Sequence, residues 1–481
     1  MRRVHGSLWI GLTAALFLGG CAGAIQEGAF RSVERTVQER SGLLVERLAF
    51  GSEAEERVAR SVQELLEAPL TEENAVRIAL LNNRELQAAY EELGVVAADW
   101  LDAGLVENPV LRGSAGFPTA EEDSGSDGTG PDLLAEVEWN VLSLFTRSLR
   151  RGSVGPKVAA AQARVAAAVL ETVRRVRRAY AEVQAAEARV ELFQQATAAA
   201  EAAELLAQRL REAGNIPEFD RLAQISFAQQ MRISLEQAIA ARDAARERLN
   251  ALLGLWGPQT GWTLSGERLS DPPETLELPE NLEAEAVRRS LELAALRQEI
   301  EAEAKRLGLL NATRWVQDLE LSVETERQDG EWEAGPGLRL PLPLFDRKQG
   351  QRAAAEARLR QLAHRYTAQA VAVRAAARTA QRRLIAAHRI AQYYRSSVLP
   401  LHERLVERAL LRYNAMQIGV FQLLAAKQAQ VQAADRYTEA LREYWQAWYD
   451  LQALQSGTTL ELVSSPLPAA MEATPSAEGG H

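Results

Sequence analysis

The chain has 481 residues but a single cysteine and few aromatic residues, and no apolar stretch after residue 20 is long enough for a transmembrane helix. A lone cysteine cannot form an internal disulfide, so no covalent cross-link stabilises the fold. Aromatic residues make up 6% of the chain, and its 31 glycines and 17 prolines fall in a few clusters. The intervening sequence is rich in Ala, Leu, Glu, Gln and Arg, which predicts long helices rather than separate globular domains.

The sequence also lacks the motifs of catalysis and of nucleic-acid binding. The formal net charge is −10, and no basic stripe separates from the acidic residues around it, so nucleic acid is not an expected partner. No Gly-rich phosphate loop, nucleophile motif or His-x-x-x-His pair occurs, and His364, His388 and His402 are scattered over predicted helices. We therefore expect no enzyme activity, no cofactor and no metal site.

The N-terminus predicts export and lipidation. Two arginines precede a short apolar stretch at residues 8–18, which is too short for a bilayer and indicates a signal peptide of residues 1–20. The following Leu18-Gly19-Gly20-Cys21 resembles a bacterial lipobox, which implies that Cys21 is acylated and becomes a lipid anchor. Ala22 after it, rather than Asp, implies by the same resemblance sorting to the outer membrane. An ordinary signal peptide with an incidental cysteine is the alternative.

The rest of the chain contains an internal duplication. Leu142-Ser143-Leu144-Phe145-Thr146-Arg147 and Leu342-Pro343-Leu344-Phe345-Asp346-Arg347 each close an alternating segment before a long helical run, at an offset of 342 − 142 = 200. The long helical runs are broken around Ile216 and Ile418, at an offset of 418 − 216 = 202. Each half is predicted to contain a helix, a strand hairpin and a long helical hairpin.

The predicted helices follow from caps and breakers. Thr71 is a predicted N-cap for a helix that runs to about Leu105, and Pro400 is predicted to kink the second long helix. The other predicted helices cover residues 157–213, 219–253, 351–399 and 420–455. The predicted regions are a signal peptide (1–20), an N-terminal anchored segment (21–70), repeat 1 (71–255), a connector (256–281), repeat 2 (282–456) and a disordered tail (457–481).

Four predicted strands alternate between apolar and polar residues. They cover about residues 110–117, 133–141 and 319–326, and a fourth carries Leu338, Leu340, Leu342 and Leu344. Strands of about 9–11 residues can cross a bilayer, but four cannot close a barrel, which needs about eight. If they cross the membrane, several copies of the chain must share one barrel. Ordinary hairpins that cap a soluble coiled coil are the alternative.

Five motifs lie near the predicted helix starts and strand junctions: Pro69-Leu70-Thr71, Ala75-Val76, Ala79-Leu80-Leu81-Asn82-Asn83, Asn108-Pro109-Val110-Leu111 and Leu340-Pro341-Leu342-Pro343-Leu344-Phe345-Asp346-Arg347. With the duplication, they resemble the TolC-like outer membrane efflux protein family over about residues 65–456. The similarity is greatest to the lipoprotein branch that serves resistance-nodulation-division pumps, among which heavy-metal cation exporters are common.

This resemblance implies a mainly α fold with a small β part. Two long helical hairpins would form a periplasmic α-barrel, and four strands per protomer would join a twelve-stranded transmembrane β-barrel in a homotrimer. The implied partners are a periplasmic adaptor and an inner-membrane pump, and the implied location is the outer membrane. The helix breaks would form the closed periplasmic end, where the adaptor docks. Pro217 stands where the second repeat has Gly419, so the two tips need not behave alike.

Three groups of candidate site residues follow from these predictions. If the apolar strand faces meet lipid, a set of glutamates lines the lumen and favours cations, although any aqueous lumen is polar. The tips would hold a gate and an adaptor contact, although Asp220 could equally cap its helix or pair with a neighbouring cation. The candidates are Glu136, Glu138, Glu320, Glu324 and Glu326 for the lumen, Asp220, Gln417 and Gln422 for the gate, and Gly214, Ile216, Met416, Ile418 and Gly419 for adaptor contact.

These predictions lead to a passive exit duct of a tripartite efflux pump. Two alternatives remain at this point: a periplasmic adaptor lipoprotein, which would have one hairpin flanked by split lipoyl-like β segments, and a duct for type I protein secretion. A lipid-anchored structural coiled coil is a further alternative and predicts no conductance.

Overall fold

A computed structural model describes residues 27–48, 53–116, 132–266, 269–328 and 331–460. The predicted signal peptide, Cys21 and most of the predicted tail lie outside the described residues. The chain divides into two units. The first comprises residues 1–184, 240–267 and 291–369, and the second comprises residues 185–239, 268–290 and 370–481. Among the helices described, none is long and apolar enough to span a bilayer.

The first unit begins with helical residues 27–41, followed by α2 (Glu53–Glu67), α3 (Glu72–Asn82) and α4 (Arg84–Ala103). The predicted cap is confirmed, because Thr71 Oγ1 accepts the N–H of Asn74 at 3.2 Å. The single helix predicted up to Leu105 is wrong, since Asn83 divides it. The Asn83 side chain accepts the N–H of Leu86 at 3.0 Å and so caps α4.

One antiparallel sheet in the first unit contains β1 (Val110–Gly116), β2 (Asp132–Asn140), β3 (Glu320–Gln328) and β4 (Glu331–Arg339), in the order β1-β2-β3-β4. The predicted fourth strand was placed too late, because β4 ends at Arg339 and Leu340, Leu342 and Leu344 follow outside it. Pro341 and Pro343 explain this end, since proline has no N–H to donate to a strand ladder.

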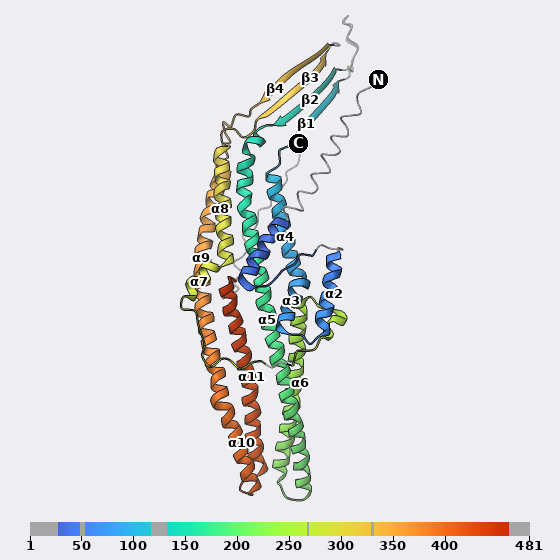
Figure 1. Ribbon diagram of the computed structural model, residues 1–481, viewed down its shortest axis with the longest axis vertical. Coiled ribbons are helices and arrows are strands. Elements are labelled where there is room, and N and C mark those ends of the chain that lie inside the picture. Colours follow the sequence, from blue (N-terminus) through green and yellow to red (C-terminus); the bar gives the residue numbers. More distant parts are fainter. Residues whose placement is uncertain (1–26, 49–52, 117–131, 267–268, 329–330, 461–481) are drawn as a thin grey trace. The chain divides into compact units, whose positions relative to one another are not determined.

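Four helices continue from the strands in the same order: α4, α5 (Leu142–Glu212), α8 (Leu291–Ala312) and α9 (Gln349–Tyr393). In the first unit the Arg151 guanidinium lies 3.8 Å from the Trp100 ring centroid and joins α5 to α4. An ion pair between Arg164 and Glu299 joins α5 to α8, and the Gln369 amide donates to Glu292 between α9 and α8. The helix layer therefore follows the strand order, with α4 and α9 at its two ends (Figure 1).

The observed α5 begins fifteen residues before the predicted start, since 157 − 142 = 15. The predicted strand-to-helix junction after Val141 is thus already helical, and Pro156 lies inside the helix. Tertiary contacts offset the local cost of this proline: Arg150 donates to the Leu105 carbonyl at 3.1 Å, and Gly155 approaches Trp100. A prediction based only on glycine and proline as helix breakers therefore placed the start of α5 wrongly.

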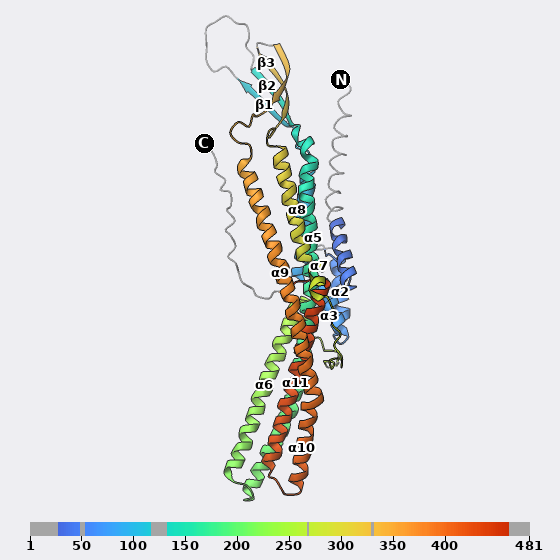
Figure 2. The same cartoon turned by 90° about the vertical axis from the view of Figure 1, so that its left-hand side faces the viewer.

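The second unit contains residues 185–212 of α5, residues 218–239 of α6 (Glu218–Leu253) and residues 370–393 of α9. It also contains α7 (Leu282–Arg289), α10 (Leu399–Asn414) and α11 (Val420–Ser456). Small side chains allow close helix packing, since Ala196, Ala200 and Ala228 form a buried cluster with Met231 against which Val431 packs. Figure 2 shows α10 and α11 side by side in this unit. Helix–helix contact here is thus made by alanines more than by large apolar residues.

The irregularity predicted at Pro400 is present as a π-helical turn. Residues Tyr394–Val398 form this turn, in which the N–H of Leu399 donates to the Tyr394 carbonyl. The wider turn accommodates a proline at the start of α10. The middle of the connector is held beside this turn, because Arg395 pairs with Asp271 at 3.2 Å and Tyr437 donates to the same carboxylate.

Candidate functional site

The strand register determines where the predicted lumen glutamates lie. Glu136 is directly opposite Glu324, and Glu138 is opposite Ser322. Since alternate residues of a strand point to one side, the register places all five predicted glutamates on one face of the sheet: Glu136, Glu138, Glu320, Glu324 and Glu326. Their role as a lumen lining stays a prediction.

The opposite face of the sheet is mostly apolar, although Arg327 of β3 lies on it at the end away from the helices. One row of paired residues consists of Leu111, Val137, Val323 and Pro336. Further along the same face lie Trp139, Leu321 and Leu338, all of them exposed. A sheet with one carboxylate-rich face and one exposed apolar face is suited to separate water from hydrocarbon.

Charge on the polar face differs between its two halves. In the half next to the helices, Arg112 pairs with Glu138 at 2.9 Å and with Glu136 at 3.6 Å. Arg339 there lies 3.3 Å from both Glu138 and Glu320. Glu324 lies in the same row as Arg112 and Glu136, at the start of the far half, and neither it nor Glu326 forms an ion pair with any described residue. Two arginines thus compensate three of the five predicted glutamates.

Two acidic residues of β4 on this face, Glu331 and Glu333, were missed by the sequence reasoning. Glu333 of β4 lies directly opposite Glu326 of β3 and adds to the uncompensated far half. They were missed because the fourth strand was placed too far along the chain. The alternation of Glu331, Glu333 and Gly335 before the proline-containing segment was the signal that could have located them.

Both hairpin tips belong to the second unit, and both end their first helix in the same way. At the first tip the N–H of Asn215 donates to the Leu210 carbonyl at 2.8 Å, with Gly214 at φ +74°. At the second tip the N–H of Gln417 donates to the Arg412 carbonyl at 2.9 Å, with Met416 at φ +54°. These are Schellman-type ends, which require a left-handed residue.

The predicted gate residues do not form a joint cluster among the described residues. Asp220 is half-buried in the first turn of α6 and forms no described ion pair, and Gln417 and Gln422 are exposed. The first tip is instead organised by Glu218, which pairs with Arg221 at 2.5 Å and with Arg211 at 3.3 Å. The hydrogen bond from Arg221, with the charge of Arg211 beside it, lowers the pKa of the Glu218 carboxyl.

The predicted adaptor-contact residues lie at the two tips as expected from the chain order. Gly214, Met416 and Gly419 are exposed, while Ile216 and Ile418 are half-buried. Met416 is 94% exposed. Sequence reasoning missed Phe219, which is 78% exposed in the first turn of α6, and its exposed neighbour Leu222. The spacing of these two along one helix face was the available signal.

No protein-family model matches the chain. Among proteins of known function it is 26% identical over 382 residues to the cobalt-zinc-cadmium resistance protein CzcC of Cupriavidus metallidurans, covering 79% of this chain and 88% of that protein. Three similar solved structures are the CusC transmembrane channel (TM-score 0.68, 14% identity, 81% and 92% of the two chains), the outer-membrane channel OprN (0.63, 20%, 86% and 94%) and the Campylobacter jejuni CmeC outer membrane channel (0.60, 14%, 85% and 86%).

The arrangement of two long helical hairpins with one four-stranded sheet is thus the fold of solved outer membrane channels. The chain therefore has the fold that the resemblance of its sequence to the TolC-like outer membrane efflux proteins implied. Among the described residues, no three His, Cys, Asp or Glu side chains are placed to hold a metal ion.

Proposed function

We propose that the chain is the outer membrane exit duct of a tripartite efflux system and works as a homotrimer. The observation that carries this proposal is the sheet, which has two open edges, one apolar face and one polar face. Open edges are not tolerated in lipid, so β4 of one copy must pair with β1 of the next. Three copies give twelve strands, which close around an aqueous lumen.

Conduction through such a duct is passive, and an inner-membrane pump supplies the energy. The helical hairpins extend into the periplasm, and their tips contact a periplasmic adaptor through the exposed Gly214, Met416 and Gly419. Acylation of Cys21 adds an anchor in the outer membrane. Metabolic labelling with palmitate tests this anchor, with Cys21→Ser as the unlabelled control.

The channel itself is tested with purified full-length chain in detergent and in planar bilayers. We expect a trimer by native mass spectrometry and stable ohmic conductance after reconstitution. A folded monomer that does not conduct would exclude the proposal.

The cargo that this reading favours is a metal cation. The relative named for cobalt, zinc and cadmium resistance supports this class, and so does the uncompensated acidic half of the polar face. Carboxylates in a pore lower the barrier for cations without binding them tightly, as a duct requires. In the trimer Glu324, Glu326 and Glu333 would contribute nine carboxylates, three from each copy.

Reversal potentials under a salt gradient test the selectivity. The triple variant Glu324→Gln, Glu326→Gln, Glu333→Gln should lose most of the cation preference. The matched control Glu320→Gln with Arg339→Gln removes one charge of each sign from the compensated half, and it should leave the preference nearly unchanged. Anion preference in the wild type, or equal loss in both variants, would contradict this assignment.

Two other functions are less well supported. An adaptor would have one hairpin between split β segments, whereas the described residues contain two hairpins and one continuous sheet. A duct for protein secretion shares the channel fold, so the partner must decide. Affinity purification from crosslinked envelopes should recover an inner-membrane cation pump together with an adaptor, and recovery of a secretion transporter would favour the second alternative.

A further inference from the structure

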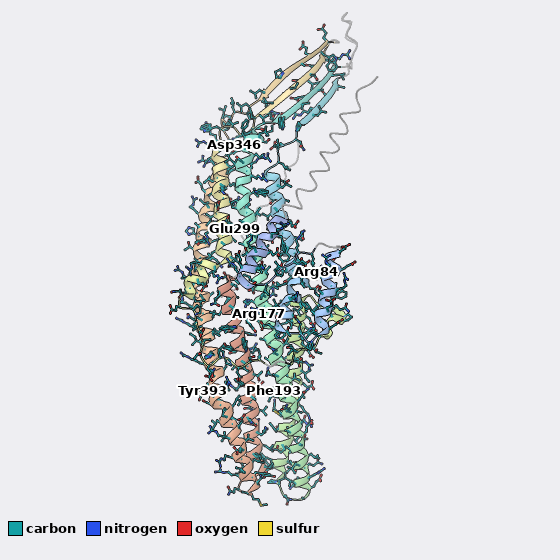
Figure 3. All side chains as sticks on the ribbon, viewed as in Figure 1. Arg84, Arg177, Phe193, Glu299, Asp346 and Tyr393 are labelled. Carbon is teal, nitrogen blue, oxygen red and sulfur yellow. The ribbon has the colours of Figure 1, made fainter. Side chains whose placement is uncertain are left out.

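The segment that joins β4 to α9 in the first unit is apolar and exposed. Residues 340–345 contain three exposed leucines and Phe345, which is 90% exposed. They follow directly on β4, which carries the exposed Leu338 on the apolar face of the sheet, so apolar residues continue past the end of the strand. Figure 3 labels Asp346 at this junction. Exposed apolar residues in this number need a partner that covers them.

The loop between α8 and β3 is fixed to this segment. Arg347 Nε donates to the Pro343 carbonyl at 3.3 Å, and Cζ of the same side chain lies 4.8 Å from the Trp315 ring centroid. Lys348 Nζ donates to Thr313 Oγ1 at 3.0 Å. The apolar segment and the tryptophan therefore belong to one surface.

Two guanidinium groups contact this tryptophan. Arg314 Cζ lies 5.3 Å from the Trp315 ring centroid, in addition to Arg347. Neither these arginines nor Lys348 form an ion pair with any described residue. Trp315 is 54% exposed, and its indole N–H donates no hydrogen bond to any described residue. The cluster therefore has three cations and one N–H donor available for an external anion.

Two nearby carboxylates bind the backbone instead of these cations. Asp346 Oδ1 accepts the N–H of Lys348 at 2.8 Å, and Asp318 Oδ1 accepts the N–H of Leu319 at 3.0 Å. The first of these bonds holds Lys348 in a left-handed conformation, at φ +57°. Backbone strain that is retained in this way commonly marks a functional position.

The first repeat shares the apolar residues of this junction but not its cations. At the offset of 200, Phe145 corresponds to Phe345 and is 74% exposed. The starts of α4 and α8 differ by 291 − 84 = 207, and at this offset Glu107 stands in place of Arg314 and Asn108 in place of the tryptophan. Apolar residues at the strand ends are thus common to both repeats, whereas the basic cluster is specific to the second.

We propose that the cluster of Arg314, Trp315, Arg347 and Lys348 binds the headgroup phosphate of an anionic phospholipid in the periplasmic leaflet of the outer membrane. The inference rests on the proposed function, which places the apolar face of the sheet in lipid and these loops at its periplasmic edge. The three leucines and Phe345 enter the acyl-chain region, the cations contact the phosphate, and the indole N–H donates at the level of the headgroups. Continuity with the apolar face and the unpaired cations together favour a lipid as the occupant.

Native mass spectrometry of the full-length chain with added phospholipid tests this site. We expect the trimer to retain phosphatidylglycerol in preference to phosphatidylcholine at about 0.1 M salt. Arg314→Gln with Arg347→Gln should lower this preference by about tenfold or more, because two cations at the headgroup are lost. Arg314→Lys with Arg347→Lys keeps both charges and should retain most of the preference. Arg147→Gln with Lys157→Gln, which removes the same charge from exposed sites of α5, is the matched control and should change the preference little.

Several outcomes would overturn the lipid site and leave the channel proposal standing. Equal retention of the two lipids by the wild type, or an equal loss in the control variant, would exclude a specific site. Displacement of phosphatidylglycerol by an equal concentration of inorganic phosphate would assign a free anion as the occupant. Dissociation of the trimer in the glutamine variant would assign the cluster to contact between copies. A monomeric wild type that does not conduct would instead overturn the channel proposal itself.

Discussion

The two hairpin tips have the same backbone hydrogen-bond pattern but stabilise it by different means. The first tip has Gly214 at the left-handed position, and glycine adopts this backbone conformation without strain because it has no side chain. The second places Met416 there, at an offset of 416 − 214 = 202, and its side chain is 94% exposed. A non-glycine residue in this conformation carries strain of about 1 kcal/mol or more. The combination of a strained backbone and an exposed apolar side chain at Met416 supports the prediction that this residue contacts a partner.

The two tips also differ in charge. Glu218 joins Arg211 and Arg221 at the first tip. Adding the offset of 202 gives Tyr413, Val420 and Leu423 at the second tip, which are uncharged. The first tip is therefore held by an unstrained turn and an ion cluster, and the second is a strained turn with an apolar surface. We expect the second tip to open more readily and to bind the adaptor more strongly.

The largest change in this comparison should come from Gly214→Val. A β-branched side chain at φ +74° adds about 1–2 kcal/mol of backbone strain, although the added Cβ would meet no atom within 4 Å. Hydrogen exchange of amides 210–216 should accelerate by about tenfold, with the second tip unchanged as an internal control. Gly214→Ala should give a smaller effect, and equal protection in both variants would refute the strain argument.

A smaller and opposite change is expected at the second tip from Met416→Gly. Removal of the strain should stabilise the turn by up to about 1 kcal/mol, partly offset by the greater freedom of glycine in the unfolded chain. Met416→Asn should share the gain because asparagine tolerates this conformation, and Met416→Leu should not. Hydrogen exchange of amides 411–418 measures all three variants.

The same variants separate stability from docking. If the methionine side chain contacts the adaptor, Met416→Gly and Met416→Asn should reduce adaptor crosslinking in envelopes while the turn becomes more stable. Met416→Leu should retain crosslinking. Undiminished crosslinking with a stabilised tip would show that the side chain is not the contact.

Much of the fold followed from the sequence because its signals are local. The cap at Thr71, the break at Gly214 and the alternation in β2 each depend on a few neighbouring residues. Prediction failed where tertiary contacts decide. The helix through Pro156 is stabilised by packing on Trp100, and the division at Asn83 coincides with its bond to the Leu252 carbonyl at the end of α6.

The candidate site residues, like the fold, were predicted from the sequence only in part. Alternation alone grouped the five strand glutamates. Arg112 reaches Glu136 and Glu138 within the β1–β2 hairpin, but the approach of Arg339 to Glu138, 201 residues away, depends on the register between β2 and β3. At the first tip, Arg211, Glu218 and Arg221 are close together in the sequence. Side-chain geometry nevertheless decides which of the nearby acidic residues pairs with both arginines. Asp220 was predicted as the gate carboxylate, whereas Glu218 forms the ion pairs at this tip. Figure 3 labels Phe193 and Tyr393 in the same unit, well above the tips.

The smallest expected effect is a pH dependence confined to the first tip. The folded-state pKa of Glu218 is lowered from 4.5, first by the hydrogen bond from Arg221 and further by Arg211. A lowered folded pKa means that the stabilisation is present above the unfolded value and is lost as the pH falls through the folded value. Because the carboxyl is exposed, solvent screens the pairs and the effect is modest. Amides 215, 216 and 218–222 should therefore be better protected in the wild type than in Glu218→Gln at about pH 6, and this difference should shrink as the pH falls below 4.5. Comparing the two proteins at the same pH cancels the intrinsic exchange rate, and the second tip, which has no such pair, should show no difference at either pH. A difference that persists or grows in acid would mean that Glu218 acts through packing rather than charge.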